Sequence, residues 1–442
     1  MFSVIIAAYN SENSIEKTLD NILFSLRNIE SEIIVVDDGS TDNTLNILKN
    51  YKDIIVFHQK NQGVSSARNT GIKIMSKKSK FVTFIDDSDY VSSDFFEKSI
   101  EFFQKNQHIK LAVSPIIVIE NNQKKNHFLN YRFNDNKEIV NIFRDYSYIH
   151  FHIGGVVFKS EIFSSNKNLF DENIHFWEDA KLFNNLILSY QKYGLIHDVN
   201  YYYYRDNQNS LAKSAWNDKE RYNDHIEKNF LSLINNSIKT YGKVIKYVQY
   251  LVIIHYLQFL FSHNFQYINV NYILENNQFL KQSQKLLFYI DKDIIDELKI
   301  DKRYKFFIYK LKGINIDNEL NYINIYIHKF DITKMALIFS FSEEAFDITD
   351  DSKVYIKNKK NCRQAKFIKK YEKDILHYIS NDFSRNIFEV KLKFRELFYK
   401  NTFIIKNDEN LNIRIVNESF VKRVLNKIKI YIERKIKNAG KF

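Results

Sequence analysis

Three aspartates within four positions follow the apolar residues FVTFI, which end at residue 85. Asp86, Asp87 and Asp89 would repel one another unless a cation lies among them. Hard divalent ions such as Mg²⁺ or Mn²⁺ bind carboxylate oxygens, usually one or two per site together with substrate phosphates. The spacing of Asp87 and Asp89 therefore suits a site that bridges a metal to a diphosphate. The alternative is that these acids cap a helix N-terminus before residues 91–103.

The elements that must position these acids alternate over the first hundred residues. Short β-branched runs predict strands, and apolar residues at helical spacing predict the helices between them. Such alternation is typical of a parallel, doubly wound sheet, which binds ligands beyond the carboxyl ends of its strands. The predicted strands are 2–8, 32–38, 54–59 and 80–86, and the predicted helices are 11–26, 40–51 and 64–75, with N-caps at Ser11 and at Ser40 or Thr41.

Polar residues follow three of these predicted strands. Tyr9 and Asn10 come after the first strand, Asp37 and Asp38 after the second, and the aspartates of 86–89 after the fourth. Because parallel strands end at the same edge of a sheet, we expect these residues to lie near one another.

The remainder of the chain divides into regions with different patterns. Residues 110–120 and 126–133 are predicted strands, 176–190 is a predicted helix that opens with two acids, and 200–207 is a predicted strand leading into a polar loop. Helical periodicity dominates from 218 to 312. Alternation with period two then predicts a small antiparallel sandwich, with strands at 322–327, 335–341, 353–357, 388–394 and 411–416.

These patterns predict an α/β fold with a mainly parallel, Rossmann-like sheet, followed by a helical region and a small β-sandwich-like domain. On the predicted sandwich strand 388–394, Phe388, Val390, Leu392 and Phe394 face one way. The predicted divisions are 1–217 for the catalytic domain, 218–314 for the helical region, 315–417 for the antiparallel β domain, and 418–442 for a basic amphipathic helix.

Composition limits the classes of function. The net charge of the 442 residues is +12, which suggests an anionic partner. The single cysteine, Cys362, excludes an internal disulfide and is typical of a reducing compartment. We find no signal peptide, and the longest apolar stretch, 247–261, is shorter than the roughly 20 residues of a transmembrane helix. These features predict a cytoplasmic protein.

Four motifs in order carry a resemblance to a known family. They are SVIIAAYNSENSIEKTLDNIL, EIIVVDDGSTDNT, NQGVSSARNTGI and FVTFIDDSDY, joined later by HFWEDAKLF. Together they resemble the nucleotide-sugar domain of family-two glycosyltransferases, which have the GT-A fold. The resemblance covers residues 2–215 and does not specify one sugar.

The resemblance implies a UDP-sugar site. The backbone of Ala7 and Ala8 and the ring of Tyr9 would cradle uracil, with base stacking worth about 1–3 kcal/mol. Asp38 or Asp37 would accept the uracil N3–H, and Arg68 would reach the diphosphate or the base, since its planar fork suits phosphate. The predicted nucleotide-sugar residues are Ala7, Ala8, Tyr9, Asn10, Asp37, Asp38, Gly63, Arg68, Asp86, Asp87, Arg205 and Ser210.

The acidic motif departs from the family pattern at Ser88, where an acid usually stands. Asp89 is the preferred metal ligand, with Asp87 as the second predicted ligand, and Asp86 would then support the ribose. The departure leaves the roles of Asp86 and Asp87 open and allows weak metal dependence. His152, His175 and His197 are the other candidate ligands, although a lone histidine is more often structural.

The resemblance places the catalytic base in the pair Glu178 and Asp179. Inverting transfer needs a base that takes the proton of the acceptor hydroxyl, and the second acid, Asp179, has this predicted role. Glu178 would support it or contact the acceptor. The alternative is that both are ordinary acids at a helix start. The segment after 204 resembles the family's loop that closes over the donor phosphates, with Arg205, Asn209, Ser210 and Lys213 as candidate contacts.

We therefore expect an inverting glycosyltransferase that moves a hexose or N-acetylhexosamine from a UDP-sugar to a bacterial cell-surface glycan or lipid-linked glycan, using Mn²⁺ or Mg²⁺. Capsule, lipooligosaccharide and teichoic acid are the candidate products, and no nucleic acid is expected as partner. The basic segment 418–442 could contact the inner face of the membrane, and the C-terminal region could form a homo-oligomer. The alternatives are a nucleotidyltransferase on a related fold and a non-catalytic basic scaffold.

Overall fold

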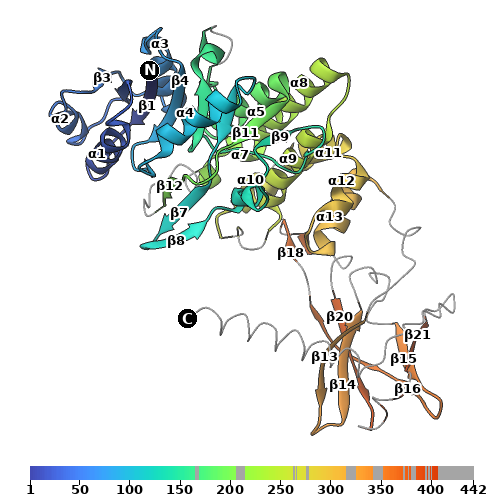
Figure 1. Ribbon diagram of the computed structural model, residues 1–442. Helices are drawn as coiled ribbons and strands as arrows, with labels where there is room; N and C mark the ends of the chain where they lie inside the picture. Colours follow the sequence, from blue (N-terminus) through green and yellow to red (C-terminus); the bar gives the residue numbers. More distant parts are fainter. Residues whose placement is uncertain are drawn as a thin grey trace. The chain divides into compact units, whose positions relative to one another are not determined.

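The computed structural model describes most of the chain in two compact units (Figure 1). One unit comprises residues 1–259 and 264–295, and the other comprises 260–263 and 296–442. The described residues are 1–164, 169–205, 215–261, 264, 266–274, 278–314, 325–341, 352–371, 374–376, 378–379, 385–393, 396, 399 and 401–406.

The first unit is built on an eight-stranded sheet of order β3-β2-β1-β4-β10-β6-β11-β9. The four N-terminal strands are parallel, as the alternation predicts, while β10 runs antiparallel to both of its neighbours. The strands are β1 (Phe2–Ala8), β2 (Ser31–Asp37), β3 (Ile55–His58), β4 (Phe81–Asp86), β6 (Leu111–Val113), β9 (Ile139–Asn141), β10 (Val156–Lys159) and β11 (Lys192–Leu195).

Helices join these strands and bury their apolar faces on the sheet. The helices are α1 (Ile15–Leu26), α2 (Thr44–Leu48), α3 (Val64–Ile74), α4 (Phe95–Lys105) and α5 (Glu178–Tyr190). Residues Ile15, Leu19 and Ile22 of α1 are fully buried at helical spacing. Helix α3 approaches β1 closely at Gly71, where a Cβ atom would lie 2.3 Å from Cγ2 of Ile5.

Three details of this region differ from the sequence predictions. Helix α1 begins after Ser14 rather than Ser11, whose backbone N–H donates to Oγ1 of Thr44. Helix α2 begins only at Thr44, because Asp42 accepts bonds from its N–H and hydroxyl and holds the preceding turn. Helix α4 follows Asp94, so the aspartates of 86–89 are not its capping acids.

A second, four-stranded sheet of order β5-β12-β7-β8 packs in the same unit. Its strands are β5 (Tyr90–Val91), β7 (Ile116–Glu120), β8 (Gln123–Asn126) and β12 (Tyr201–Tyr204). The predicted strand 110–120 is therefore wrong as one element, because Pro115 separates β6 in one sheet from β7 in the other. The β7–β8 hairpin lies beside β12 (Figure 1).

The predicted strand 126–133 is also wrong over most of its length. Residues Phe128–Phe133 form a 3-10 helix, η1, in which the His127 ring accepts from the N–H of Leu129. Leu129 and Arg132 are both fully buried. Their spacing of three places them on one face of a 3-10 helix, whereas a strand would turn them to opposite faces.

Most of the predicted helical region belongs to the first unit. Its elements are α7 (Glu220–His225), the π-helix η4 (Ile226–Leu231), α8 (Ser232–Tyr241), α9 (Lys246–Tyr256), α10 (Val270–Leu274), α11 (Gln278–Phe288) and α12 (Lys292–Glu297). Helix α9 begins one residue before the stretch 247–261, and most of its residues are buried. Where the chain is described, no helix is both long and apolar enough to cross a membrane.

The second unit contains α13 (Lys302–Lys312) and two main antiparallel sheets that share one core. The first sheet has the order β13 (Ile325–Asp331), β14 (Ala336–Phe341), β20 (Arg385–Lys391), β17 (Lys366–Tyr371); the second has the order β16 (Cys362–Gln364), β15 (Lys353–Lys357), β21 (Thr402–Lys406). A small pair, β18 (Asp374–Ile375) and β19 (Tyr378–Ile379), adds to them.

The apolar faces of these two sheets pack together. The rings of Phe339 and Phe403, one from each sheet, have centroids 5.1 Å apart. Phe388, Val390 and Leu392 are buried, as their alternation predicts, whereas Cys362 is exposed. Phe394, the predicted strand 411–416 and the predicted helix 418–442 lie outside the described residues.

Candidate active site

The predicted site residues of the N-terminal strands meet at one edge of the sheet. In the parallel ladders, Ala7 is in register with Asp86, and Ala8 is in register with Asp37. Tyr9 follows directly and is 48% exposed. The carboxyl ends of β1, β2 and β4 therefore form the rim at which open α/β sheets bind ligands.

Arg68 joins two acidic segments that are distant in sequence. From helix α3, its Nη2 lies 2.8 Å from Oδ1 of Asp86, and its Nη1 lies 2.9 Å from Oε1 of Glu178. The arginine is 4% exposed, and the two carboxylates raise its pKa further despite burial. The structure thus brings the strand-end acids of β4 next to the acids that open α5.

Glu178 and Asp179 occupy the first turn of α5 and differ in their hydrogen bonds. Oδ2 of Asp179 accepts from the N–H of Ile153 at 3.1 Å, and Oδ1 accepts from the N–H of Ala180 at 2.7 Å. Burial raises the pKa of Asp179, while Arg68 acts to lower it. Burial and the neighbouring Asp179 raise the pKa of Glu178 to about 7, although Arg68 acts in the opposite sense.

The turn before α5 is held by the helical region. Trp177 has φ 70°, a left-handed conformation that costs a non-glycine residue about 1–3 kcal/mol. Its indole Nε1 lies 3.3 Å from Nε2 of His255 on α9. The ring centroids of Trp177 and Phe230 are 5.1 Å apart. Packing of these helices therefore compensates the strain and fixes the direction from which Glu178 and Asp179 enter the site.

Asp87 lies beside the residues that follow β1. Its Oδ2 accepts from the backbone N–H of Tyr9 at 3.2 Å. Burial raises the pKa of Asp87 to about 7; the bond from Tyr9 acts to lower it, and the adjacent Asp86 raises it further. Excess negative charge gathers here, since Arg68 is shared by Asp86 and Glu178. The carboxylate of Asp87 therefore fits a divalent cation.

Asp89, the preferred metal ligand from sequence, is placed differently. It is fully buried, and its two oxygens accept from the hydroxyl of Tyr201 at 2.6 Å and from the N–H of Tyr204 at 2.8 Å. Burial and the charge of Asp86 hold the pKa of Asp89 well above its usual range. Asp89 is thus enclosed, whereas Asp87 is only partly buried, and the metal role of Asp89 stays a prediction.

Asp38, one of the predicted uracil-binding residues, forms hydrogen bonds with the loop that follows β3. Asp38 accepts from the N–H groups of Gln62 and Gly63 at 3.0 and 2.8 Å, and from the side chain of Gln59 at 2.8 Å. Gly63 has φ 90°, which glycine adopts without steric cost, and it directly precedes α3. Asp38 therefore positions the start of the helix that carries Arg68.

Asp37 and Asn10 have contacts of their own at this edge. Asp37 is fully buried, with Oδ2 2.5 Å from Nδ1 of His58, and its other oxygen has no hydrogen-bond partner. Asn10 accepts from the N–H of Thr41 at 2.8 Å and so connects the loops after β1 and β2.

The structure adds residues that the motifs do not single out. Ile153 contributes only its backbone N–H to Asp179, which side-chain chemistry cannot reveal. The hydroxyl of Tyr201, predicted as strand core, supports Asp89. Gly154 packs tightly against the Tyr201 ring, where a Cβ would lie 2.4 Å away. The adjacent glycines Gly154 and Gly155 are the signal that could have pointed to this segment.

The three candidate histidines have different surroundings. Nδ1 of His152 accepts from the N–H of Gly154 at 2.9 Å, and burial lowers the pKa of His152 to about 4, so it is neutral near pH 7. His197 contacts the carbonyl of Lys137 at 2.8 Å. His175, Asp218 and Glu220 each offer one ligand atom, and these three atoms lie within 4.8 Å of one another.

The loop residues after β12 are only partly described. The guanidinium carbon of Arg205 lies 5.4 Å from the ring centroid of Tyr203, and the backbone N–H of Arg205 donates to the carbonyl of Ile119. Asn209, Ser210 and Lys213 lie outside the described residues. The described site combines a strand-end nucleotide edge, a shared buried arginine and paired carboxylates, a set suited to binding an anionic donor and deprotonating a hydroxyl.

Comparisons with known proteins give the same overall assignment. The family described as Glycosyl transferase family 2 matches residues 3–165. The minor teichoic acid biosynthesis protein GgaA of Bacillus subtilis (strain 168) is 30% identical over 97% of this chain and 100% of the relative. The poly(ribitol-phosphate) beta-glucosyltransferase of Bacillus spizizenii is 30% identical over 46% of this chain and 32% of the relative.

A solved structure supports the fold. S. aureus TarS 1–349, in complex with UDP-GlcNAc, has a TM-score of 0.54 and 18% identity, covering 72% of this chain and 88% of that protein. The predicted fold class, a mainly parallel α/β sheet followed by β-sheets, is confirmed.

Proposed function

Because the chain belongs to glycosyl transferase family 2, we propose that it moves a hexose or N-acetylhexosamine from a UDP-sugar to a teichoic-acid-type polymer with inversion at the anomeric carbon. The observation that carries this proposal is the position of Arg68, which joins Asp86 at the nucleotide edge to Glu178 beside Asp179. Family membership decides against the scaffold and nucleotidyltransferase alternatives.

The donor would bind along the ends of β1, β2 and β4. The exposed ring of Tyr9 is available for stacking on uracil. Asp38, which is 3% exposed and already accepts from Gln59, Gln62 and Gly63, would accept the uracil N3–H as a further bond. The guanidinium of Arg68 is held by two carboxylates, so it supplies charge near the diphosphate without moving freely. The TarS structures with UDP-GlcNAc and UDP have the same fold, which supports a uridine diphosphate sugar as donor.

A divalent ion, Mn²⁺ or Mg²⁺, would be held by Asp87 with donor phosphate oxygens. The ion supplies positive charge that stabilises the leaving diphosphate. Asp87 retains carboxylate capacity beyond its bond to Tyr9. Asp89 would instead hold β12 against the acidic motif through Tyr201 and Tyr204.

Asp179 would take the proton of the acceptor hydroxyl. Its carboxylate is oriented by the N–H groups of Ile153 and Ala180, and burial raises its pKa toward that of a useful base. Glu178 bonds Arg68 and therefore positions that cation rather than the acceptor. In this proposal Asp179 is the base, and Glu178 holds the guanidinium of Arg68 in place.

Our proposals for the acceptor and for the location of the protein rest on its composition and on its relatives. Two relatives are named for teichoic acid biosynthesis or for poly(ribitol-phosphate), and the net charge of +12 suits a polyanion. We propose that the protein works on the cytoplasmic side, with the basic C-terminal segment near the inner leaflet and the C-terminal region as the place for self-association.

The test is transfer from radiolabelled UDP-sugars to poly(ribitol phosphate) and poly(glycerol phosphate), with Mn²⁺ present. Asp179→Asn should lower transfer by about 10²–10⁴-fold while UDP still raises the melting temperature. Asp198→Asn is the matched control, since Asp198 is exposed with φ 62°, a conformation asparagine also adopts. Full transfer by Asp179→Asn would mean that the base is misassigned.

A further inference from the structure

The side chains of strand β12 border two regions, the acidic motif and a separate hollow. Successive side chains of a strand point to opposite faces, so the tyrosines of 201–204 alternate. Tyr201 bonds Asp89 on one face, whereas Tyr202 stacks on Tyr90, with ring centroids 5.1 Å apart. Tyr202 therefore lies on the face of β12 opposite to the side chain that bonds Asp89, although Tyr90, its stacking partner, directly follows Asp89.

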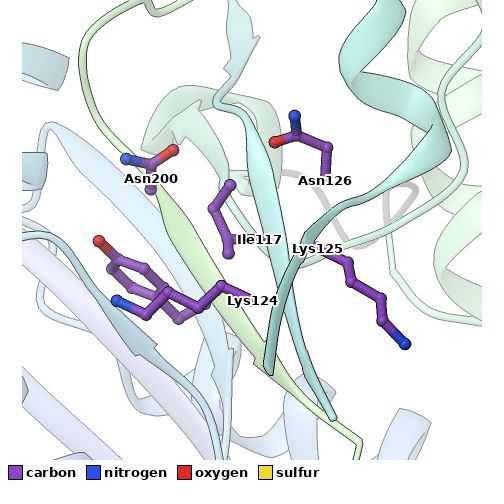
Figure 2. A pocket seen from close by; sticks show the side chains of 6 residues that line it. Ile117, Lys124, Lys125, Asn126 and Asn200 are labelled. Atoms are coloured by element: carbon purple, nitrogen blue, oxygen red, sulfur yellow. The ribbon is translucent and has the colours of Figure 1, made fainter. Parts of the chain in front are cut away.

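A hollow of about 320 Å³ lies at Tyr202 (Figure 2). This volume is at the small end of ligand sites, which run roughly 300–1,000 Å³. Strands β7, β8 and β12, with the residue before β12, contribute its lining, which is made of Ile117, Lys124, Lys125, Asn126, Asn200 and Tyr202. None of these six residues carries a carboxylate.

Of the two lysines that line this hollow, Lys124 is the one beside its aromatic ring. Its Nζ lies 5.1 Å from the ring centroid of Tyr202, and it forms no ion pair within the described part of the chain. Lys125, the next residue on β8, points away from Lys124 (Figure 2) and lies 3.4 Å from Oε2 of Glu120. The hollow thus has one unpaired ammonium group beside an aromatic ring.

The remaining lining offers contacts for hydroxyl groups and for an apolar face. Asn126 and Asn200 carry amides that both donate and accept hydrogen bonds, and Figure 2 shows them on either side of Ile117. Ile117 and the Tyr202 ring supply apolar surface. An ammonium group, two amides and an aromatic face in one place match a hydroxylated carbon chain that carries phosphate.

We propose that this hollow binds a phosphate-linked polyol unit of the acceptor polymer, distant from the hydroxyl that receives the sugar. The inference rests on the proposed function and adds a subsite to it. Lys124 bonds the phosphate, the two amides bond hydroxyls, and the CH groups of the polyol pack on Tyr202. Binding here lengthens the contact between enzyme and polymer, so long acceptors bind more tightly than short ones.

The experiment compares Lys124→Gln with Lys125→Gln. Both remove one positive charge from a residue that lines the hollow, but only Lys124 packs its ammonium group on the Tyr202 ring, whereas that of Lys125 pairs with Glu120. Initial rates are measured with the best UDP-sugar and with either poly(ribitol phosphate) or a single ribitol phosphate as acceptor. Lys124→Gln should raise KM for the polymer roughly tenfold with kcat unchanged, whereas Lys125→Gln should change KM less than twofold.

With the single ribitol phosphate, both variants should match the wild type. Asn200→Ala is a second variant and should also raise KM for the polymer alone. Equal KM values of the Lys124 and Lys125 variants for the polymer would overturn the inference. A rise in KM of the Lys124 variant for the single ribitol phosphate as large as its rise for the polymer would also overturn it. Inhibition by single-stranded DNA that equals competition by the polymer and depends on Lys124 would also overturn it, in favour of a nucleic-acid site.

The outcomes separate the two proposals. Absence of transfer by the wild type with every UDP-sugar would contradict the proposed function. Transfer that is normal in the wild type and indistinguishable in Lys124→Gln would contradict only the polymer subsite. Hydrolysis of the UDP-sugar without acceptor should be the same in all variants, because the hollow lies on the opposite face of β12 from Asp89.

Discussion

Arg68 and Glu178 lie 110 positions apart in the sequence and form a buried ion pair with a distance of 2.9 Å. The same guanidinium also bonds Asp86. One arginine on α3 therefore connects the strand that carries the acidic motif to the helix that carries the predicted base. Since buried charges are costly when unpaired, this connection is both structural and electrostatic.

Removal of Arg68 should destabilise the protein. Arg68→Gln leaves two carboxylates without their cation, and breaking a buried pair costs about 3–5 kcal/mol. Urea unfolding measures this loss. Arg68→Gln combined with Glu178→Gln should lose less than the sum of the single variants, because the second change removes one unpaired charge.

Arg27→Gln is the control for this prediction, since Arg27 is exposed and should change the free energy of unfolding by about 0.5 kcal/mol or less. Additive effects of the Arg68 and Glu178 changes would mean that the ion pair contributes no coupling.

Asp87 and Asp89 should respond differently to substitution. Asp87→Asn should weaken Mn²⁺ binding in the presence of UDP, whereas Asp89→Asn should chiefly lower stability by about 1–3 kcal/mol, because Tyr201 and Tyr204 lose one of their carboxyl acceptor oxygens. Calorimetric titration with Mn²⁺ and thermal unfolding measure the two effects. His175→Ala tests the second group of ligand atoms in the same titration.

Unchanged Mn²⁺ affinity in Asp87→Asn, with a loss in Asp89→Asn, would restore Asp89 as the metal ligand. A loss confined to His175→Ala would move the cation to the group that His175 forms with Asp218 and Glu220.

Stability should depend on pH through Asp87 and Glu178. Both have pKa values raised to about 7, so the native state holds protons that the unfolded state releases above about 4. Their contribution to the free energy of unfolding is therefore full below pH 4 and is lost as pH rises toward 7. Buried histidines such as His152, with pKa about 4, act in the opposite sense.

The double variant Asp87→Asn, Glu178→Gln isolates the carboxyl contribution. Relative to the wild type, its free energy of unfolding should increase from pH 5 to pH 8, as measured in urea at fixed ionic strength. Glu101→Gln, at an exposed position, should show no such trend. A difference that is constant with pH would contradict the raised pKa values.

Close packing of α3 on β1 should depend on Gly71. A Cβ at this position would meet Ile5 at 2.3 Å, so Gly71→Ala forces the helix outward. Overpacking of this kind costs about 1–3 kcal/mol. Transfer should fall as well, because Arg68 lies on the same helix.

Gly242→Ala serves as the comparison for Gly71→Ala. No atom lies within 4 Å of a Cβ at Gly242, so any loss there comes from its φ of 72° rather than from a clash. Ile5→Ala combined with Gly71→Ala should lose less stability than the sum of the two single variants, because alanine at position 5 has no Cγ2 for the new Cβ to meet. Additive losses would mean that the clash is relieved elsewhere.

The order of motifs was enough to predict much of the fold. Apolar strand runs separated by amphipathic helices depend on local periodicity, so the parallel strands β1, β2, β3 and β4 and helix α5 were predictable. The prediction failed at Pro115 and at residues 128–133, where neighbouring sheets and a 3-10 turn compete for short apolar segments.

By itself the sequence determined which residues are predicted to carry chemistry: the acids of 86–89, Arg68, and the pair Glu178 and Asp179. Only the tertiary structure decided which contacts each of them makes, because burial and hydrogen bonds depend on distant segments. Tyr201 and Tyr204 enclose Asp89, and the N–H of Ile153 orients Asp179. Such contacts join positions more than twenty residues apart, and local periodicity carries no information about them.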